Sequence, residues 1–296
     1  MTSLPLLAVP NVSEGRDRAS VEAIAAAFTA DGAARLLDVH ADVDHHRAVV
    51  SLAGHPGTLA QALARGAAEA VRSIDLADGR RGAHPHVGAV DVVPVVYLSE
   101  ELRGAACAEA LVAAHAIGSE VEVPVLMYGE LAAGRTRAEL RRGGASALAQ
   151  RLRSGELSPD FGPRTVGAAA GVTLVAARAP LVAFNLELAP PAGVREAASI
   201  AAAIREGGAQ GLPGLRAIGV ALRRGTGIVG QVSMNVERPA ELPLAEVVAA
   251  VARHAQVARA ELVGLAPRAA LEGFPQSLPM PGFDPARHVI ENALGL

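Results

Sequence analysis

The stretch ARLLDVHADVDHHRAVVSLA, residues 34–53, decides the fold. Residues 34–40 and 47–53 are two apolar runs of strand length, and a short polar segment separates them. This pattern predicts two strands that follow each other directly, without a helix between them. Such a pair is the central step of a βαββαβ order.

The elements on both sides of this pair complete that order. Apolar side chains at helical spacing predict a helix before the pair, and a proline at the start of a second apolar stretch predicts a helix after it. The neighbouring elements expected are a strand at 4–10, a helix at 18–29, a helix at 56–73, a strand at 91–98, a further helix from Ser99 and a strand at 121–128.

The same order occurs again after residue 180. The glycines of RRGTG, residues 223–227, suit a tight hairpin between two of the later strands. Two such units predict an α+β fold of two βαββαβ (ferredoxin-like) subdomains, with stacked mixed sheets, helices outside and a ligand cleft between. The later elements expected are strands at 181–187, 215–222, 228–237 and 259–265, and helices at 193–206 and 242–258.

The segment between the two units, residues 132–179, has a different character. It begins with two short basic helical stretches and ends in a loop rich in glycine and proline, with little periodicity. A loop of this length in a compact protein is usually functional, and a plain linker is the alternative.

The composition excludes several classes of protein. Hydrophobic residues make up 51% of the chain, but Trp is absent and Tyr and Phe are few, so the core must be built from Ala, Val and Leu. The net charge of −3 and the lack of basic clusters with interleaved aromatics argue against nucleic acid as a partner. No apolar run reaches the ~18 residues of a membrane span. A single cysteine, Cys107, and a start without a signal-peptide pattern predict a cytoplasmic protein.

Two polar stretches stand at strand ends, where they can meet at one end of a sheet. They are DVHADVDHHR, residues 38–47, and GAHPHVGAVD, residues 82–91. Histidines beside carboxylates suit general acid–base catalysis, in which a carboxylate fixes the tautomer of the histidine. The same residue types suit a divalent metal, as in a metal hydrolase. Because local sequence fixes no set of three ligands, no metal is expected.

A set of motifs, taken together, resembles a known family. VPNVSEGRD, DVHADVDHHRAVVSLAG, HPHVGAVDVVPVVYL, VPVLMYGE, PDFGP and LVAFNLEL occur in the order, and close to the spacing, of glutamate formimidoyltransferases. The chain is similar to the formiminotransferase domain from Val9 to about Leu271. The resemblance implies an N-terminal subdomain over 1–178, a C-terminal subdomain over 179–296, and a homodimer. It also implies transfer of a formimidoyl group between N-formimidoyl-L-glutamate and tetrahydrofolate, a step of histidine degradation and one-carbon metabolism.

The resemblance also assigns roles to residues. His84 matches the catalytic histidine of the family's H-P-x-x-G-A-x-D-V motif, and Asp91 is expected to orient it or to serve as a structural acid. His40 stands where the animal enzymes have an acid, and it is expected to handle a second proton or to contact the amidine. The residues expected to bind glutamate or folate are Asn11, Ser13, Arg47, Arg135, Asp160, Phe161, Gly162, Pro163, Arg164, Gly171 and Arg178.

Two further interpretations stay open. Small residues fill the segment that resembles the folate loop, residues 160–172, and Ala170 stands where the animal enzymes have Trp. A pterin stacks less well on such a surface. A related formyl or formimidoyl transferase with a different acceptor is therefore one alternative, and a folate-binding protein without catalysis is another.

Overall fold

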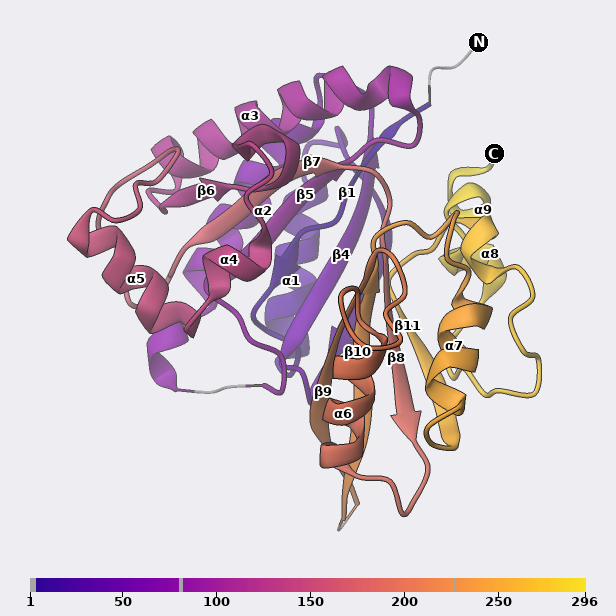
Figure 1. Cartoon of the computed structure of the whole chain (residues 1–296). Coiled ribbons are helices and arrows are strands. Elements are labelled where there is room, and N and C mark those ends of the chain that lie inside the picture. Colours follow the sequence, from indigo (N-terminus) through magenta and orange to yellow (C-terminus); the bar gives the residue numbers. More distant parts are fainter. Residues whose placement is uncertain (1–3, 80–81, 226) are drawn as a thin grey trace. The chain divides into compact units, whose positions relative to one another are not determined.

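The computed structural model describes residues 4–79, 82–225 and 227–296 (Figure 1). The chain forms two compact units, unit 1 over Met1–Ala179 and unit 2 over Pro180–Leu296. Across the described ranges, helices are all too short or too polar to cross a membrane.

Unit 1 begins with the expected βαββαβ order and extends it. The strands are β1 (Leu6–Ala8), β2 (Asn11–Val12), β3 (Arg35–Asp42), β4 (Arg47–Gly54), β5 (Val90–Val96), β6 (Val125–Met127) and β7 (Thr173–Arg178). The helices are α1 (Arg18–Thr29), α2 (Leu59–Ser73), α3 (Arg103–Glu120), α4 (Arg137–Arg141) and α5 (Gly144–Ser154).

The sheet of unit 1 is mixed. Its antiparallel part runs from β3 through β4 and the short β1 and β2 to β5, and β7 and then β6 follow in parallel. The main core packs α1, α2 and α3 against one face. A smaller core packs α4 and α5 against the other face over β5, β7 and β6, so α4 and α1 lie on opposite sides of the sheet in Figure 1. Only part of this second face is therefore covered by helices of unit 1.

The prediction of a loop up to residue 179 is wrong for β7. Its sequence, TLVAAR, is almost completely buried because helices cover both of its faces. A strand buried on both faces shows no alternation of polar and apolar residues. Periodicity therefore gave no signal, although the short apolar run itself is typical of a buried parallel strand.

Unit 2 is a second α+β unit, which confirms the predicted fold class. Its four-stranded sheet has the order β11-β8-β10-β9 and is antiparallel throughout rather than mixed. The first and last strands thus lie side by side, as in a ferredoxin-like fold, and α6 and α7 pack on one face. Its strands are β8 (Val182–Leu188), β9 (Leu215–Arg224), β10 (Gly227–Val236) and β11 (Val257–Val263), and its helices are α6 (Val194–Ile204), α7 (Leu244–Ala252), α8 (Pro285–His288) and α9 (Ile290–Leu294).

Two details of unit 2 differ from the prediction or lie outside it. The helix expected to reach residue 258 ends at Ala252, and β11 begins at Val257, because a turn at residues 253–256 separates them. The predicted RRGTG hairpin joins β9 and β10, but its Thr226 lies outside the described residues.

A buried acid on α3 caps the start of α2. Glu109 accepts a hydrogen bond from the amide of Ala60 at 2.7 Å and another from the amide of Gly57. The N-cap residue Thr58 instead donates its hydroxyl to the carbonyls of Ala33 and His55. Glu109 therefore satisfies the free amides and the positive end of α2 in place of a local cap.

We expect Glu109→Ala to lower the free energy of unfolding by about 2 kcal/mol, because two amides lose a charged acceptor. Alanine favours helix formation in α3, so the loss cannot come from helix propensity. Thermal unfolding by calorimetry should show the fall. The control is Glu120→Ala on the exposed end of the same helix, which should change stability by less than about 0.5 kcal/mol. Equal effects of the two substitutions would contradict the capping role.

Candidate functional site

The two polar stretches named from the sequence meet in unit 1. The turn before β5, which contains His84, is joined to the β3–β4 hairpin by a hydrogen bond from the amide of Ala83 to the carbonyl of Asp44 at 2.9 Å. Arg47, at the start of β4, places Nη1 2.6 Å from Nδ1 and 3.0 Å from Nε2 of His84. An imidazole, a guanidinium group and the hairpin thus share one site.

Glycines allow the loops of this site to approach so closely. A Cβ atom on Gly88 would lie 2.2 Å from the carbonyl oxygen of Val172, and one on Gly15 would lie 2.2 Å from that of Asp42. Ser13 fastens the same region, because its hydroxyl donates to the carbonyl of Gly88 at 2.7 Å. The predicted binding residue Ser13 therefore holds the loop after β2 against the His84 turn.

Asn11 and Asp91 fix the side chain of Arg47. The amide oxygen of Asn11 accepts from Nε of Arg47 at 2.8 Å and also from Nη2, while its own amide donates to the carbonyl of Val9 at 2.7 Å. Asp91 lies 3.6 Å from Nη1 on the other side. Burial is the main cause that lowers the pKa of Arg47, to about 10, and Asp91 opposes the shift. Arg47 is therefore a well-positioned cation at neutral pH.

Asp91 links the site to α4. Its side chain is 1% exposed, and its carboxylate accepts from the amide of Val87 at 2.9 Å and from Nη2 of Arg141. Asp91 contacts Arg47, and Arg47 in turn contacts the imidazole of His84. Asp91 therefore acts on His84 through Arg47. The predicted acid is thus at the site as a partner of two cations.

His84 is half-buried and its environment favours the neutral ring. Nδ1 lies 2.8 Å from the carbonyl oxygen of Pro85. In the tautomer that donates from Nδ1 to this carbonyl, Nε2 carries the lone pair and faces Nη1 of Arg47 at 3.0 Å. Burial is the largest cause that holds the pKa of His84 well below its usual value, and the positive charges of Arg47 and Arg141 lower it further. Once Arg47 moves away from Nε2, the lone pair of this neutral imidazole can act as a general base.

His40 lies on the hairpin beside this group. It pairs with Val49, and the next pair on the same face of the ladder joins Asp42 to Arg47. His40 and Arg47 are therefore diagonal neighbours, a relation that typically spans ~7–8 Å. The carboxylate of Asp42 is occupied by the amides of Asp44 and His45, each at 2.7 Å, and shapes the hairpin turn.

Three residues of the site were missed from the sequence: Tyr128, Arg137 and Arg141. The guanidinium group of Arg137 lies 5.7 Å from the centre of the Tyr128 ring, and both residues act on Arg47. A capping box between Thr136 and Glu139 starts α4. The spacing T-x-x-E in the sequence is the signal that predicts this helix. Because a helix places residues four positions apart on one face, Arg137 and Arg141 lie on the same face of α4.

The first part of the predicted folate loop is fastened to β6 and α3. Arg135 donates through Nε and Nη2 to the carbonyl of Met127, at 3.0 and 2.7 Å, and also pairs with Asp160, which accepts from the Met127 amide. The ring of Phe161 lies edge-on to His115, with ring centres 6.1 Å apart. A Cβ atom on Gly162 would lie 2.5 Å from the carbonyl oxygen of Val123. These contacts hold this part of the loop against β6 and α3.

The last part of the same loop reaches the His84 turn. Pro163 and the exposed Arg164 continue the loop, and Gly171 then pairs with Gly88. The amide of Val172 donates to the carbonyl of Val87 at 2.9 Å. Only this end of the predicted folate loop therefore borders the candidate site.

Arg178 lies away from His84. It pairs with Val96 at the end of β5, whereas Asp91 is near the beginning of that strand. Five residues of strand correspond to about 16 Å. Arg178 therefore does not join the group around His84.

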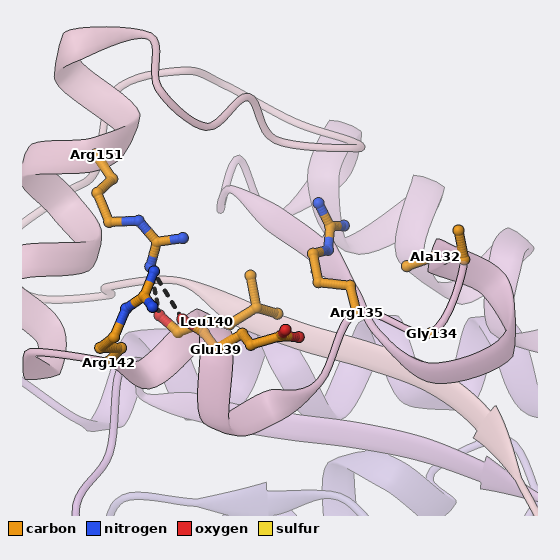
Figure 2. Close-up of a pocket in the computed structure, with 8 residues that line it drawn as sticks. Ala132, Gly134, Arg135, Glu139, Leu140, Arg142 and Arg151 are labelled. Atoms are coloured by element: carbon orange, nitrogen blue, oxygen red, sulfur yellow. Dashed lines mark hydrogen bonds between the residues drawn. The ribbon is translucent and has the colours of Figure 1, made fainter.

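A shallow pocket of about 390 Å³ lies along α4, and Figure 2 shows its lining. Arg135, Arg142 and Arg151 line it together with Glu139. Nη1 of Arg151 donates to the carbonyls of Glu139 and Leu140 at 3.1 and 3.2 Å, so it caps the end of α4. This pocket is distinct from the group around His84.

Comparison with known proteins gives a consistent result. The model of the formiminotransferase domain, N-terminal subdomain, matches residues 6–178. The chain is 32% identical to a glutamate formimidoyltransferase of Streptococcus pyogenes serotype M1 over 97% of both chains. It is 31% identical to one of Thermoplasma acidophilum over 89% of this chain and 88% of the other. It is also 35% identical to the mouse formimidoyltransferase-cyclodeaminase, over 61% of this chain and 34% of that protein.

Proposed function

Because the chain belongs to the formiminotransferase domain family, we propose that it transfers a formimidoyl group between N-formimidoyl-L-glutamate and tetrahydrofolate. The observation that carries this proposal is the position of His84, whose Nδ1 lies 2.8 Å from the Pro85 carbonyl and whose surroundings lower its pKa. In the tautomer that donates from Nδ1 to this carbonyl, Nε2 is the basic atom. Residues 1–178 are then the N-terminal subdomain of the family and residues 179–296 its C-terminal subdomain.

The chemistry needs one group that takes and returns a proton. N5 of tetrahydrofolate attacks the amidine carbon, and a tetrahedral intermediate forms. Nε2 of His84 accepts the proton that N5 loses and donates it to the glutamate nitrogen as the carbon–nitrogen bond to glutamate breaks. Free L-glutamate and 5-formimidoyl-tetrahydrofolate leave, and His84 is neutral again.

The other residues serve this step. Asp91 and Asn11 are positioning residues that hold Arg47 beside the imidazole. His40, a diagonal neighbour of Arg47, handles the second proton or contacts the amidine. The Gly171 end of the loop is the part that contacts the acceptor, because it borders the His84 turn. The family further supports a cytoplasmic homodimer in histidine degradation and one-carbon metabolism.

The test is direct. Purified protein is incubated with N-formimidoyl-L-glutamate and tetrahydrofolate, and 5-formimidoyl-tetrahydrofolate is measured by absorbance after acid conversion to the methenyl form. Turnover supports the proposal. Binding of both compounds without transfer would contradict it and favour a binding protein, while transfer to an acceptor other than tetrahydrofolate would favour a related transferase.

The pH dependence of kcat/KM should follow the lowered pKa of His84. Burial, Arg47 and Arg141 disfavour the protonated ring, so the basic form persists as the pH falls through the usual histidine value of about 6.5. We therefore expect the acid limb of the kcat/KM profile to have its midpoint clearly below pH 6.5. A profile measured at constant ionic strength from pH 4.5 to 8.5 tests this, and a midpoint at or above pH 6.5 would exclude His84 in this environment as the titrating base.

A further inference from the structure

We propose that Tyr128, Arg137 and Arg141 form, with Arg47, a subsite for the two carboxylates of a glutamyl group. The inference rests on the proposed function and deepens it, because it assigns substrate contacts to residues of α4 and of the segment before it. The chemistry recognised is a dicarboxylate, which both the donor and the tail of a folate contain.

The first argument is charge. Within the part of the chain that the structure describes, the charged groups acting most strongly on Arg47 are Asp91, Arg141 and Arg137. The Asp91 carboxylate pairs with Arg47 and Arg141, and Arg137 adds a third positive charge that acts on Arg47. With His84 in its neutral form, the described residues of this half-buried cluster hold three guanidinium groups and one carboxylate, which leaves two positive charges in excess. Buried charges need partners, and a dianion supplies the two that are missing.

The second argument is hydrogen bonding. Tyr128 is 6% exposed, and among the described residues its buried hydroxyl has no hydrogen-bond partner. Nε of Arg141 is likewise buried, without a partner in the same described set. Buried polar groups are nearly always satisfied, so two orphaned donors beside three cations indicate a missing acceptor. A carboxylate is an acceptor of the matching charge.

The third argument is the position relative to the reacting atoms. In N-formimidoyl-L-glutamate, the α-carboxylate is bonded to the carbon beside the leaving nitrogen. A cation in contact with the proton-transferring ring is therefore where that carboxylate must lie, and Nη1 of Arg47 is 3.0 Å from Nε2 of His84. When the α-carboxylate binds Arg47, it draws the guanidinium group away from Nε2 and frees the base. The γ-carboxylate is then directed to Tyr128, Arg137 and Arg141.

Tyr128→Phe is the sharpest test, because it removes an unpartnered hydroxyl and should leave thermal stability unchanged. The dissociation constants of L-glutamate and of glutarate, measured by titration calorimetry, should rise at least about tenfold. This is the change expected when a complex loses one hydrogen bond to a charged group. Arg137→Gln should have a similar effect. The matched control is Tyr97→Phe, which loses a hydrogen bond to Glu130 at 2.9 Å and should bind both compounds as the unmodified protein does.

Calorimetry with glutarate needs no turnover, so its result is independent of the proposed function. Weaker glutarate binding in Tyr128→Phe supports the subsite even if no transfer is found. Unchanged binding in both Tyr128→Phe and Arg137→Gln would overturn it even if transfer occurs. A raised KM for N-formimidoyl-L-glutamate alone assigns the subsite to the donor. A raised KM for tetrahydrofolate, but not for tetrahydropteroate, assigns it to the folate tail.

Discussion

His84→Ala lowers kcat for formimidoyl transfer by about 10²- to 10⁴-fold, the range for loss of a general acid–base group. In the neutral ring Nε2 is the base, and the alanine side chain offers no group that can accept a proton in its place. The KM for both substrates should change much less than kcat, because the ring acts in proton transfer rather than in uniform binding. Initial rates over a substrate matrix measure the two separately.

Two comparisons make this result specific. His55→Ala, in an exposed turn before α2, should retain the full rate. Calorimetry of His84→Ala should show a folded protein, since the substitution removes a half-buried neutral ring. A variant that keeps kcat within about threefold would remove His84 from the proton-transfer step, because that factor is far below the effect of a general base.

The order of strands and helices follows from the sequence because each βαββαβ unit alternates clear apolar patterns. The direct succession of β3 and β4 was predictable from two apolar runs with a polar turn between them. β7 was not, because burial on both faces removes the alternation that marks a strand. Periodicity thus identifies elements with one solvated face better than those in the centre of a layered fold.

Residues of the candidate site likewise fall into those that local sequence motifs predict and those that only tertiary packing brings there. His84, Arg47 and Asp91 stand in two short motifs at strand ends, where topology brings them together. Arg141 reaches the site because α4 packs over β5 and β7, and Tyr128 reaches it from the end of β6, which are tertiary relations that no local pattern contains. A motif also does not tell which end of its strand lies near the site, and the structure places Arg178 opposite Val96, at the end of β5 away from Asp91.

Asp91→Ala should be the most destabilising single change at the site, by about 3–5 kcal/mol, because it leaves Arg47 and Arg141 as uncompensated buried cations. The amide of Val87 also loses its acceptor. Urea unfolding followed by circular dichroism measures the loss. Asp91→Asn keeps the shape and removes the charge, so it should lose a large part of the same stability.

The cause of that loss can be separated from simple cavity formation. If uncompensated charge dominates, adding Arg141→Met to Asp91→Ala should restore stability, since a hydrophobic side chain then replaces an unpaired cation against the sheet. If the cavity dominates, the second substitution should reduce stability further or leave it unchanged. Coupling of at least about 1 kcal/mol between the two positions is expected for groups in one ion-pair network. Additive losses would instead mean that Asp91 stabilises unit 1 mainly through the Val87 amide, and that the cations of the site are held by solvent and by Asn11.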